Sequence, residues 1–255
     1  MVTWLADRER ITPITAVRIL YRPLDYVNLI SQRIFREKAL VPAKLRKSIE
    51  TGALIAFAMI IPLLAFVVFV VPLLWLLSPA IITIVAAMLC LRVAHTGILE
   101  YVGVTALTDA DVIKGLVSGV LARLEYWTLA VTVIVPLVLL AFIAPAAGLV
   151  MTHGDLDDGL YGLAAHTAML IGLTGANVLG AALGVLLALW QRDLVALVIG
   201  APAMLLFVGG GLAGFMLVIE APPIGLLYSA LYMVAPYYLA AGAMNLSRRW
   251  IRQIA

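Results

Sequence analysis

Residues 160–190 read LYGLAAHTAMLIGLTGANVLGAALGVLLALW and contain no Asp, Glu, Lys or Arg. A helix needs about 20 predominantly apolar residues to cross a bilayer, so this stretch is long enough to span one. The whole chain is of the same kind: of its 255 residues, 64% are hydrophobic and 12% are charged. A water-soluble domain of this size has too little polar surface to cover that apolar content. The composition predicts an all-α integral membrane protein and excludes a soluble enzyme, a nucleic-acid-binding protein and a disordered chain.

Five further apolar stretches bring the number of predicted transmembrane helices to six. A tight turn at Ser78 and Pro79 is expected to separate the first two, and the second is short, with Arg92 and His95 at its end. The predicted spans are 52–77, 79–95, 126–147, 160–190, 194–219 and 224–246.

Lysine and arginine fall on one side of this six-span topology. With a cytoplasmic N-terminus, all 17 Lys and Arg residues lie in cytoplasmic segments, and the outer connections 78–79, 148–159 and 220–223 contain none. Cytoplasmic loops of membrane proteins are enriched in these residues. Five or seven spans would place either Arg192 or the arginines near the C-terminus outside. The pattern therefore predicts six spans with both the N- and C-termini cytoplasmic.

These boundaries divide the chain into three parts. Residues 1–50 form a cytoplasmic basic arm with ten basic and five acidic residues, and such an arm suits anionic lipid headgroups. Residues 51–246 form the six-helix transmembrane domain, and residues 247–255 form a basic cytoplasmic tail.

Within the arm, residues 24–40 have an amphipathic pattern. Val27, Ile30 and Ile34 recur at helical spacing, while charged residues occupy the other faces, and prolines at 23 and 42 bracket the segment. The pattern predicts an amphipathic helix, lying either on the inner leaflet or on the protein's own inner surface.

The cytoplasmic connection between the second and third spans, residues 96–125, has the signals of a helix, a break and a second helix. Thr108 is a good N-cap, and Asp109 and Asp111 suit the first turn of the helix that follows. That helix is expected to run through Lys114 and Arg123. We expect this inner elbow to be a docking surface.

Small residues form a row on the fourth span. A residue without a bulky side chain every four positions lets helix backbones approach closely. Packing inside the bundle is favoured over a contact across a dimer, and Asn177 is expected to offer an interhelical hydrogen bond. The glycines at 209–211 and 214 predict a flexible or closely packed site in the fifth span. The row consists of Gly172, Ala176, Gly180, Gly184 and Ala188.

Motifs that carry chemistry are missing from the sequence. There is no phosphate-binding loop, no His-Glu-x-x-His and no nucleophile elbow, and the span centres hold no ionisable residue. His95, His153 and His166 lie at span ends or in a loop, and Cys90 is the only cysteine. We therefore predict no catalytic residue, no metal site and no cofactor in this chain, so any ATP and Mg²⁺ would be bound by a partner.

The order of these features resembles that of ABC-2 type transporter permeases, the membrane subunits of ABC exporters. The matching residues are TGILE at 96–100, similar to a Gly-Thr-Leu-Glu element, and LTDADVIKG at 107–115, similar to a Leu-Thr-Pro-Leu-Ser turn followed by an acidic cap. The turn lacks the family's usual proline, and the charged run that precedes the first element is reduced to Arg92 and His95.

The resemblance implies a permease subunit that works as a homo- or heterodimer in the cytoplasmic (inner) membrane of a prokaryote, with a separate soluble ATPase. It also implies an N-terminal helix along the membrane and an outer re-entrant element at 220–223 and the residues that follow. The ATPase-docking residues it implies are Thr96, Gly97, Leu99, Glu100, Thr108, Asp109, Asp111, Lys114 and Gly115.

Two other functions compete with this one. The chain could be a non-catalytic accessory or assembly subunit of a larger membrane complex, including a bioenergetic one, because polar residues are scarce within its spans. A membrane enzyme is the third alternative, and it would need a polar cluster that the predicted spans do not show.

Overall fold

The computed structural model describes residues 10–26, 28, 64–95, 107–124, 156–191, 195–220 and 222–251. Every regular element in these ranges is a helix. The elements are α2 (Pro13–Tyr21), the 3₁₀ helix η1 (Pro23–Tyr26), α5 (Leu64–His95), α6 (Asp109–Arg123), α9 (Leu156–Gln191), α10 (Val195–Glu220) and α11 (Pro222–Ile251). The predicted third span, residues 96–106, most of segment 24–40 and residues 252–255 lie outside the described residues.

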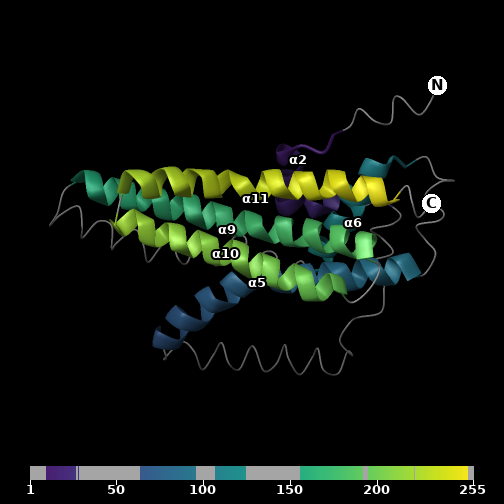
Figure 1. Cartoon of the computed structure of the whole chain (residues 1–255), viewed down its shortest axis with the longest axis horizontal. Helices are drawn as coiled ribbons and strands as arrows, with labels where there is room; N and C mark the ends of the chain where they lie inside the picture. Colours follow the sequence, from purple (N-terminus) through teal and green to yellow (C-terminus); the bar gives the residue numbers. More distant parts are fainter. Residues whose placement is uncertain are drawn as a thin grey trace.

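Four long helices lie side by side, and α9 packs against the other three (Figure 1). Three stretches of the described residues are long and apolar enough to cross a membrane: Trp75–His95, Leu160–Gln191 and Pro223–Ile251. A shorter apolar stretch, Val198–Gly214, belongs to α10. The all-α class and its membrane character follow from these helices.

Contacts between the helices give their directions. Gly180 lies against Pro79 and Gly184 against Ala86, so α5 and α9 run the same way. Gly172 lies against Tyr232 and Trp190 against Trp250, so α9 and α11 also run the same way. In contrast, α10 is antiparallel to α11, because Phe207 stacks on Tyr232 while Gly214 meets the earlier Tyr228.

The predicted turn at Ser78 and Pro79 is wrong, because α5 is one helix from Leu64 to His95. Proline removes a backbone donor and bends a helix, but neighbouring helices and hydroxyl side chains can satisfy the freed groups inside a membrane. Pro79 lacks the N–H that would donate to the carbonyl of residue 75, and one turn later the Thr83 hydroxyl donates to the Pro79 carbonyl over 2.7 Å. The helix changes direction along its length, as expected for one containing Pro72 and Pro79 (Figure 1).

The last two helices match the predicted fifth and sixth spans but differ at one end. α10 ends at Glu220 and α11 starts at Pro222, so the connection is short. Within its described residues, Pro222–Ile251, α11 is continuous and contains no break of the kind that a re-entrant element would require. It also continues to Ile251, beyond the predicted end at 246, and carries Arg248 and Arg249 in its last turn.

The row of small residues on α9 faces two different helices of the same chain. A Cβ at Gly180 would lie 2.5 Å from the Pro79 carbonyl oxygen, and one at Gly184 would meet the Thr83 carbonyl, both on α5. A Cβ at Gly172 would lie 2.6 Å from the Tyr232 carbonyl oxygen on α11. Pro236, four residues after Tyr232, has no N–H to donate to that carbonyl. Gly172 has no side chain and therefore leaves space around the Tyr232 carbonyl oxygen. Ala176 and Ala188 are buried.

A buried polar pair joins α5 to α9 at the same interface. The Ser78 hydroxyl donates to Oδ1 of Asn177 over 2.5 Å, and Nδ2 of Asn177 donates to the Thr174 carbonyl over 3.1 Å. Both Ser78 and Asn177 are fully buried. The interhelical hydrogen bond expected of Asn177 is thus confirmed.

The glycine-rich part of α10 receives tyrosines from α11. The Tyr228 hydroxyl donates to the Gly210 carbonyl over 2.7 Å, and the Tyr232 hydroxyl donates to the Phe207 carbonyl over 3.3 Å. A Cβ at Gly211 or Gly214 would collide with these rings. Of the two alternatives predicted for this stretch, close packing is therefore what the structure shows.

We predict that Gly184→Ala destabilises the protein in detergent, whereas Gly242→Ala leaves it unchanged or slightly more stable. The new methyl group at 184 would meet α5 backbone, which cannot move aside, and overpacking of this kind costs about 1–3 kcal/mol. Gly242 is the matched control, because a Cβ there meets nothing within 4 Å. Thermal unfolding of the two variants measures the difference, and equal melting temperatures would contradict the packing described here.

Candidate partner-docking surface

Basic residues gather at one end of the bundle, where α5, α9 and α11 end and α10 begins; we call this the basic end. α2, η1 and α6 lie beside it, near the C-terminal part of α11 (Figure 1). The opposite end holds the first turn of α9, with Asp157 and Asp158, and Glu220 at the end of α10. Among the described residues, the Lys and Arg residues in elements at or beside the basic end are Arg10, Arg18, Arg22, Arg92, Lys114, Arg123, Arg248 and Arg249.

α2 is an element that the sequence analysis missed. Thr12 caps it by accepting from the Thr15 N–H, and Pro13 occupies its first turn. A cap residue followed by proline is a helix-start signal, and it was present in the sequence. Ala16, Ile19 and Leu20 form its buried face.

Asn245 of α11 holds the start of α2 in place. The Ile11 N–H donates to Asn245 Oδ1 over 3.1 Å, and Asn245 Nδ2 donates to the Ile11 carbonyl over 2.8 Å. These two hydrogen bonds pair the backbone of Ile11 with a side chain 234 residues later, so no local sequence pattern could have predicted them.

The cap predicted for the inner-elbow helix is confirmed. Thr108 Oγ1 accepts from the Asp111 N–H over 3.2 Å, and Asp111 Oδ2 accepts from the Thr108 N–H over 3.4 Å, which is a capping box. The Thr108 hydroxyl also donates to Asp111 Oδ2 over 2.7 Å, and Lys114 Nζ lies 3.4 Å from Oδ1. Partial burial by itself raises the pKa of Asp111, but the hydrogen bonds from Thr108 and the Lys114 charge outweigh it and hold the pKa below its usual value. Asp111 is therefore a carboxylate at neutral pH.

Asn28 ties the N-terminal arm to the same helix. Its Nδ2 donates to the Asp111 carbonyl over 2.7 Å, and a Cβ at Gly115 would overlap the Asn28 amide. The Ser118 hydroxyl lies 3.4 Å from the carbonyl of Tyr26, which is two residues before Asn28 in the chain. Gly115 is needed because the arm crosses α6 at this point.

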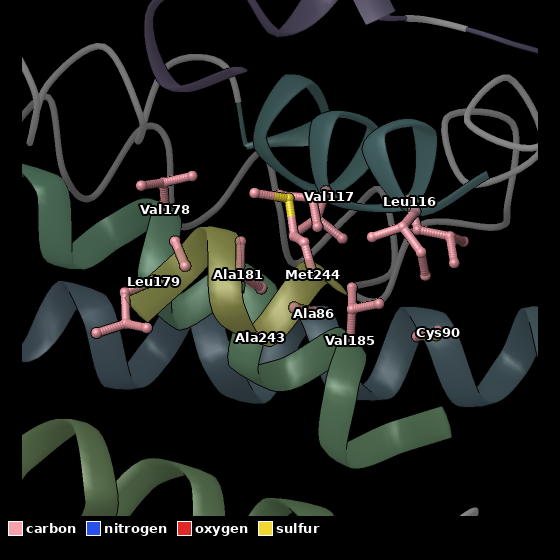
Figure 2. Close-up of a cluster of buried hydrophobic side chains, with 14 of the residues drawn as sticks. Ala86, Cys90, Leu116, Val117, Val178, Leu179, Ala181, Val185, Ala243 and Met244 are labelled. Atoms are coloured by element: carbon pink, nitrogen blue, oxygen red, sulfur yellow. The ribbon is translucent and has the colours of Figure 1, made fainter. Parts of the chain in front are cut away.

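Most of α6 is buried between other elements. Ala110, Val112 and Ile113 are buried, as is every residue from Gly115 to Ala122. Figure 2 shows Leu116 and Val117 in one cluster with Val185 of α9, Met244 of α11 and Cys90 of α5. α6 also contacts α2 and η1, so it packs against elements from both the N-terminal arm and the bundle. It therefore behaves as an internal helix that reaches the surface only near its two ends, at Asp109, Asp111 and Lys114 and at Arg123.

The structure separates the residues implied to dock a partner into three groups. Thr108, Asp109, Asp111 and Lys114 are partly exposed on or near the first turn of α6. Gly115 is buried beneath Asn28 and serves packing. The other four lie outside the described residues: Thr96, Gly97, Leu99 and Glu100.

The histidines do not come together in the described part of the chain. His95 is exposed at the end of α5, and His166 Nδ1 lies 2.5 Å from the Gly162 carbonyl of its own helix. His153 lies outside the described residues. Among those residues no group of three or more His, Cys, Asp or Glu side chains is placed to hold a metal ion.

No family model, characterised protein or solved structure matches this chain. The helix directions, the charges at the basic end and the surroundings of α6 are therefore the observations that bear on function.

Thr108→Ala is predicted to loosen the first turn of α6 without unfolding the bundle. Loss of an N-cap costs about 1 kcal/mol, so amide hydrogen exchange of Asp111 and Val112, whose N–H groups bond to Thr108, should quicken about fivefold. Exchange in α9 should stay unchanged, and Thr108→Ser should retain slow exchange because its hydroxyl still caps the helix. Equal exchange in Thr108→Ala and the unaltered protein would show that the cap contributes nothing.

Proposed function

We propose that this chain is the permease subunit of an ATP-driven exporter of the ABC-2 type, in the cytoplasmic membrane of a prokaryote. Its partner would be a soluble ATPase that binds ATP and Mg²⁺, and a second permease, identical or related, would complete the translocation pathway. The surroundings of α6 are the observation that carries the proposal.

The position of α6 suits a helix that transmits force. A partner that pushes on Thr108, Asp109 or Lys114 acts on a rigid, capped helix whose other residues are packed against α5, α9 and α11. Close-packed interiors transmit displacement instead of absorbing it. An ATPase that binds two arrangements of this surface with different affinity would shift the bundle between them.

Helix directions support six spans. In a six-span chain, the second, fourth and sixth spans run one way and the fifth runs the other way. α5, α9 and α11 run the same way and α10 is antiparallel to them, as this topology requires. α5 takes up residues 64–77 of the predicted first span, so a six-span chain needs a first crossing that begins before the predicted residue 52.

Charge segregation supports a cytoplasmic basic end. Lys and Arg remain on the cytoplasmic side of bacterial membrane proteins, and here the described ones lie in elements at or beside the end where α5, α9 and α11 finish. Asp157, Asp158 and Glu220 lie at the other end. The first turn of α6 would then face the cytoplasm, and α2 and η1 would lie at the cytoplasmic side of the membrane.

Single-cysteine labelling tests this topology. In a Cys90→Ala background, Asp25→Cys and Asp109→Cys should react with a membrane-impermeant maleimide in inverted vesicles and not in intact spheroplasts. Asp158→Cys should show the reverse. Replacement of Cys90 by alanine is suitable because Cys90 is fully buried among apolar side chains. Labelling of all three sites from the same side would reject the six-span topology.

In-cell cross-linking tests the function. A photoreactive maleimide on Asp109→Cys, in the same Cys90→Ala background, should capture a soluble ATP-binding protein. Asp158→Cys, at the opposite end, should capture none. Mass spectrometry of the adducts identifies the partner, and ATP-dependent changes in cross-linking yield would show coupling.

Redox or pigment-binding subunits captured in place of an ATPase would overturn the permease proposal. That result would instead establish the chain as an accessory subunit of a bioenergetic complex. Capture of the same ATPase at Asp158→Cys would reject docking at α6.

A further inference from the structure

The outward face of α2 and η1 combines exposed apolar side chains with arginines. Ile14 is 66% exposed, Tyr21 50% and Leu24 61%. Arg18 lies four residues after Ile14 and four before Arg22, so these side chains share one side of the helix. The inward face is held by Ile19, Leu20 and the Asn245 pair, so the outward face has a fixed orientation.

α2 runs beside the C-terminal part of a predicted membrane span. Its start is bonded to Asn245, and Tyr21, at its end, lies near Tyr237. Tyr237 precedes Arg249 by 12 residues, about 18 Å along a helix. α2 therefore descends along the side of the bundle from the basic end, to a depth where phospholipids surround the protein.

Two arginines on that surface need an anion. Arg18 and Arg22 line a shallow groove together with Asp25 and Tyr26. Within the described part of the chain, neither guanidinium forms an ion pair. An arginine facing lipid is costly unless it reaches the headgroup layer or draws a phosphate towards itself. A guanidinium suits phosphate well, because its planar array of donors matches two phosphate oxygens.

We propose that the Arg18–Arg22 groove binds the phosphate of an anionic phospholipid, with Ile14, Tyr21 and Leu24 against its acyl chains. Asp25 reduces the net charge of the groove to one positive unit, which matches a phosphodiester with a single negative charge. The Asp25 carboxylate can accept hydrogen bonds from headgroup hydroxyls. It would repel the second negative charge of a phosphate monoester. The groove should thus prefer phosphatidylglycerol to phosphatidic acid. This inference rests on the chain lying in a membrane and not on the proposed export function, so each can fail without the other.

Lipid binding by the full chain is the test. The melting temperature of each variant is measured in mixed micelles with phosphatidylcholine alone and again with added phosphatidylglycerol. The change between the two conditions is then compared among variants. The unaltered protein should be stabilised by phosphatidylglycerol. Arg18→Gln and Arg22→Gln should each weaken the apparent affinity for that lipid about fivefold, as expected for loss of one cation near a membrane surface.

Arg249→Gln is the matched control, because Arg249 is also exposed and at the basic end, and the change removes the same charge. It should leave phosphatidylglycerol affinity nearly unchanged. A loss in Arg249→Gln equal to that in Arg22→Gln would overturn the site, since a diffuse positive field would then explain binding. Equal stabilisation by soluble glycerol phosphate would also overturn it, because the groove would then bind the free anion and not a lipid.

Discussion

The described bundle depends on how closely the backbones of α5 and α11 approach the backbone of α9. Apolar burial drives helices together weakly in a membrane, because lipid is as apolar as the side chains it replaces. Close van der Waals contact and interhelical hydrogen bonds must therefore hold the helices together. Glycines at 172, 180 and 184 let the backbones of α5 and α11 come close, and Ser78 and Asn177 add a buried hydrogen bond at the α5 side. These contacts hold α5, α9 and α11 together, and α10 lies antiparallel to α11 through the Phe207–Tyr232 and Gly214–Tyr228 contacts.

Local signals predicted the parts of the structure that depend on local physics. The long apolar stretches gave α9 and α10, and the Thr108 cap gave the start of α6. The turn predicted at Pro79 was wrong because proline usually ends a helix in water, whereas α5 continues through it. α2 was missed because its buried face is short and lies within a charged arm, although Thr12 and Pro13 marked its start. The contacts of Asn245 with Ile11 and of Asn28 with Gly115 join distant segments, so the sequence pattern holds no trace of them.

The arm and the inner elbow form one continuous piece of structure. Tyr26 lines the arginine groove, and its carbonyl lies within reach of the Ser118 hydroxyl on α6. Asn28 follows and binds the carbonyl of Asp111, whose side chain caps the same helix. The proposed partner surface on α6 and the proposed lipid groove are therefore linked through the contacts of Tyr26 and Asn28 with α6. Membrane composition and partner binding would act on the same helix.

The tyrosine contacts between α10 and α11 have a mechanical consequence. Sliding one helix past the other by a single turn is a displacement of about 5.4 Å, which is far more than a hydrogen bond tolerates. Such a slide would separate the hydroxyls of Tyr228 and Tyr232 from the carbonyls of Gly210 and Phe207 and leave the hydroxyls without these partners in an apolar medium. The tyrosines therefore hold α10 and α11 in one register, so a displacement of α10 along its axis would carry α11 with it. Because α11 also packs closely on α9, such a displacement would act on the centre of the bundle.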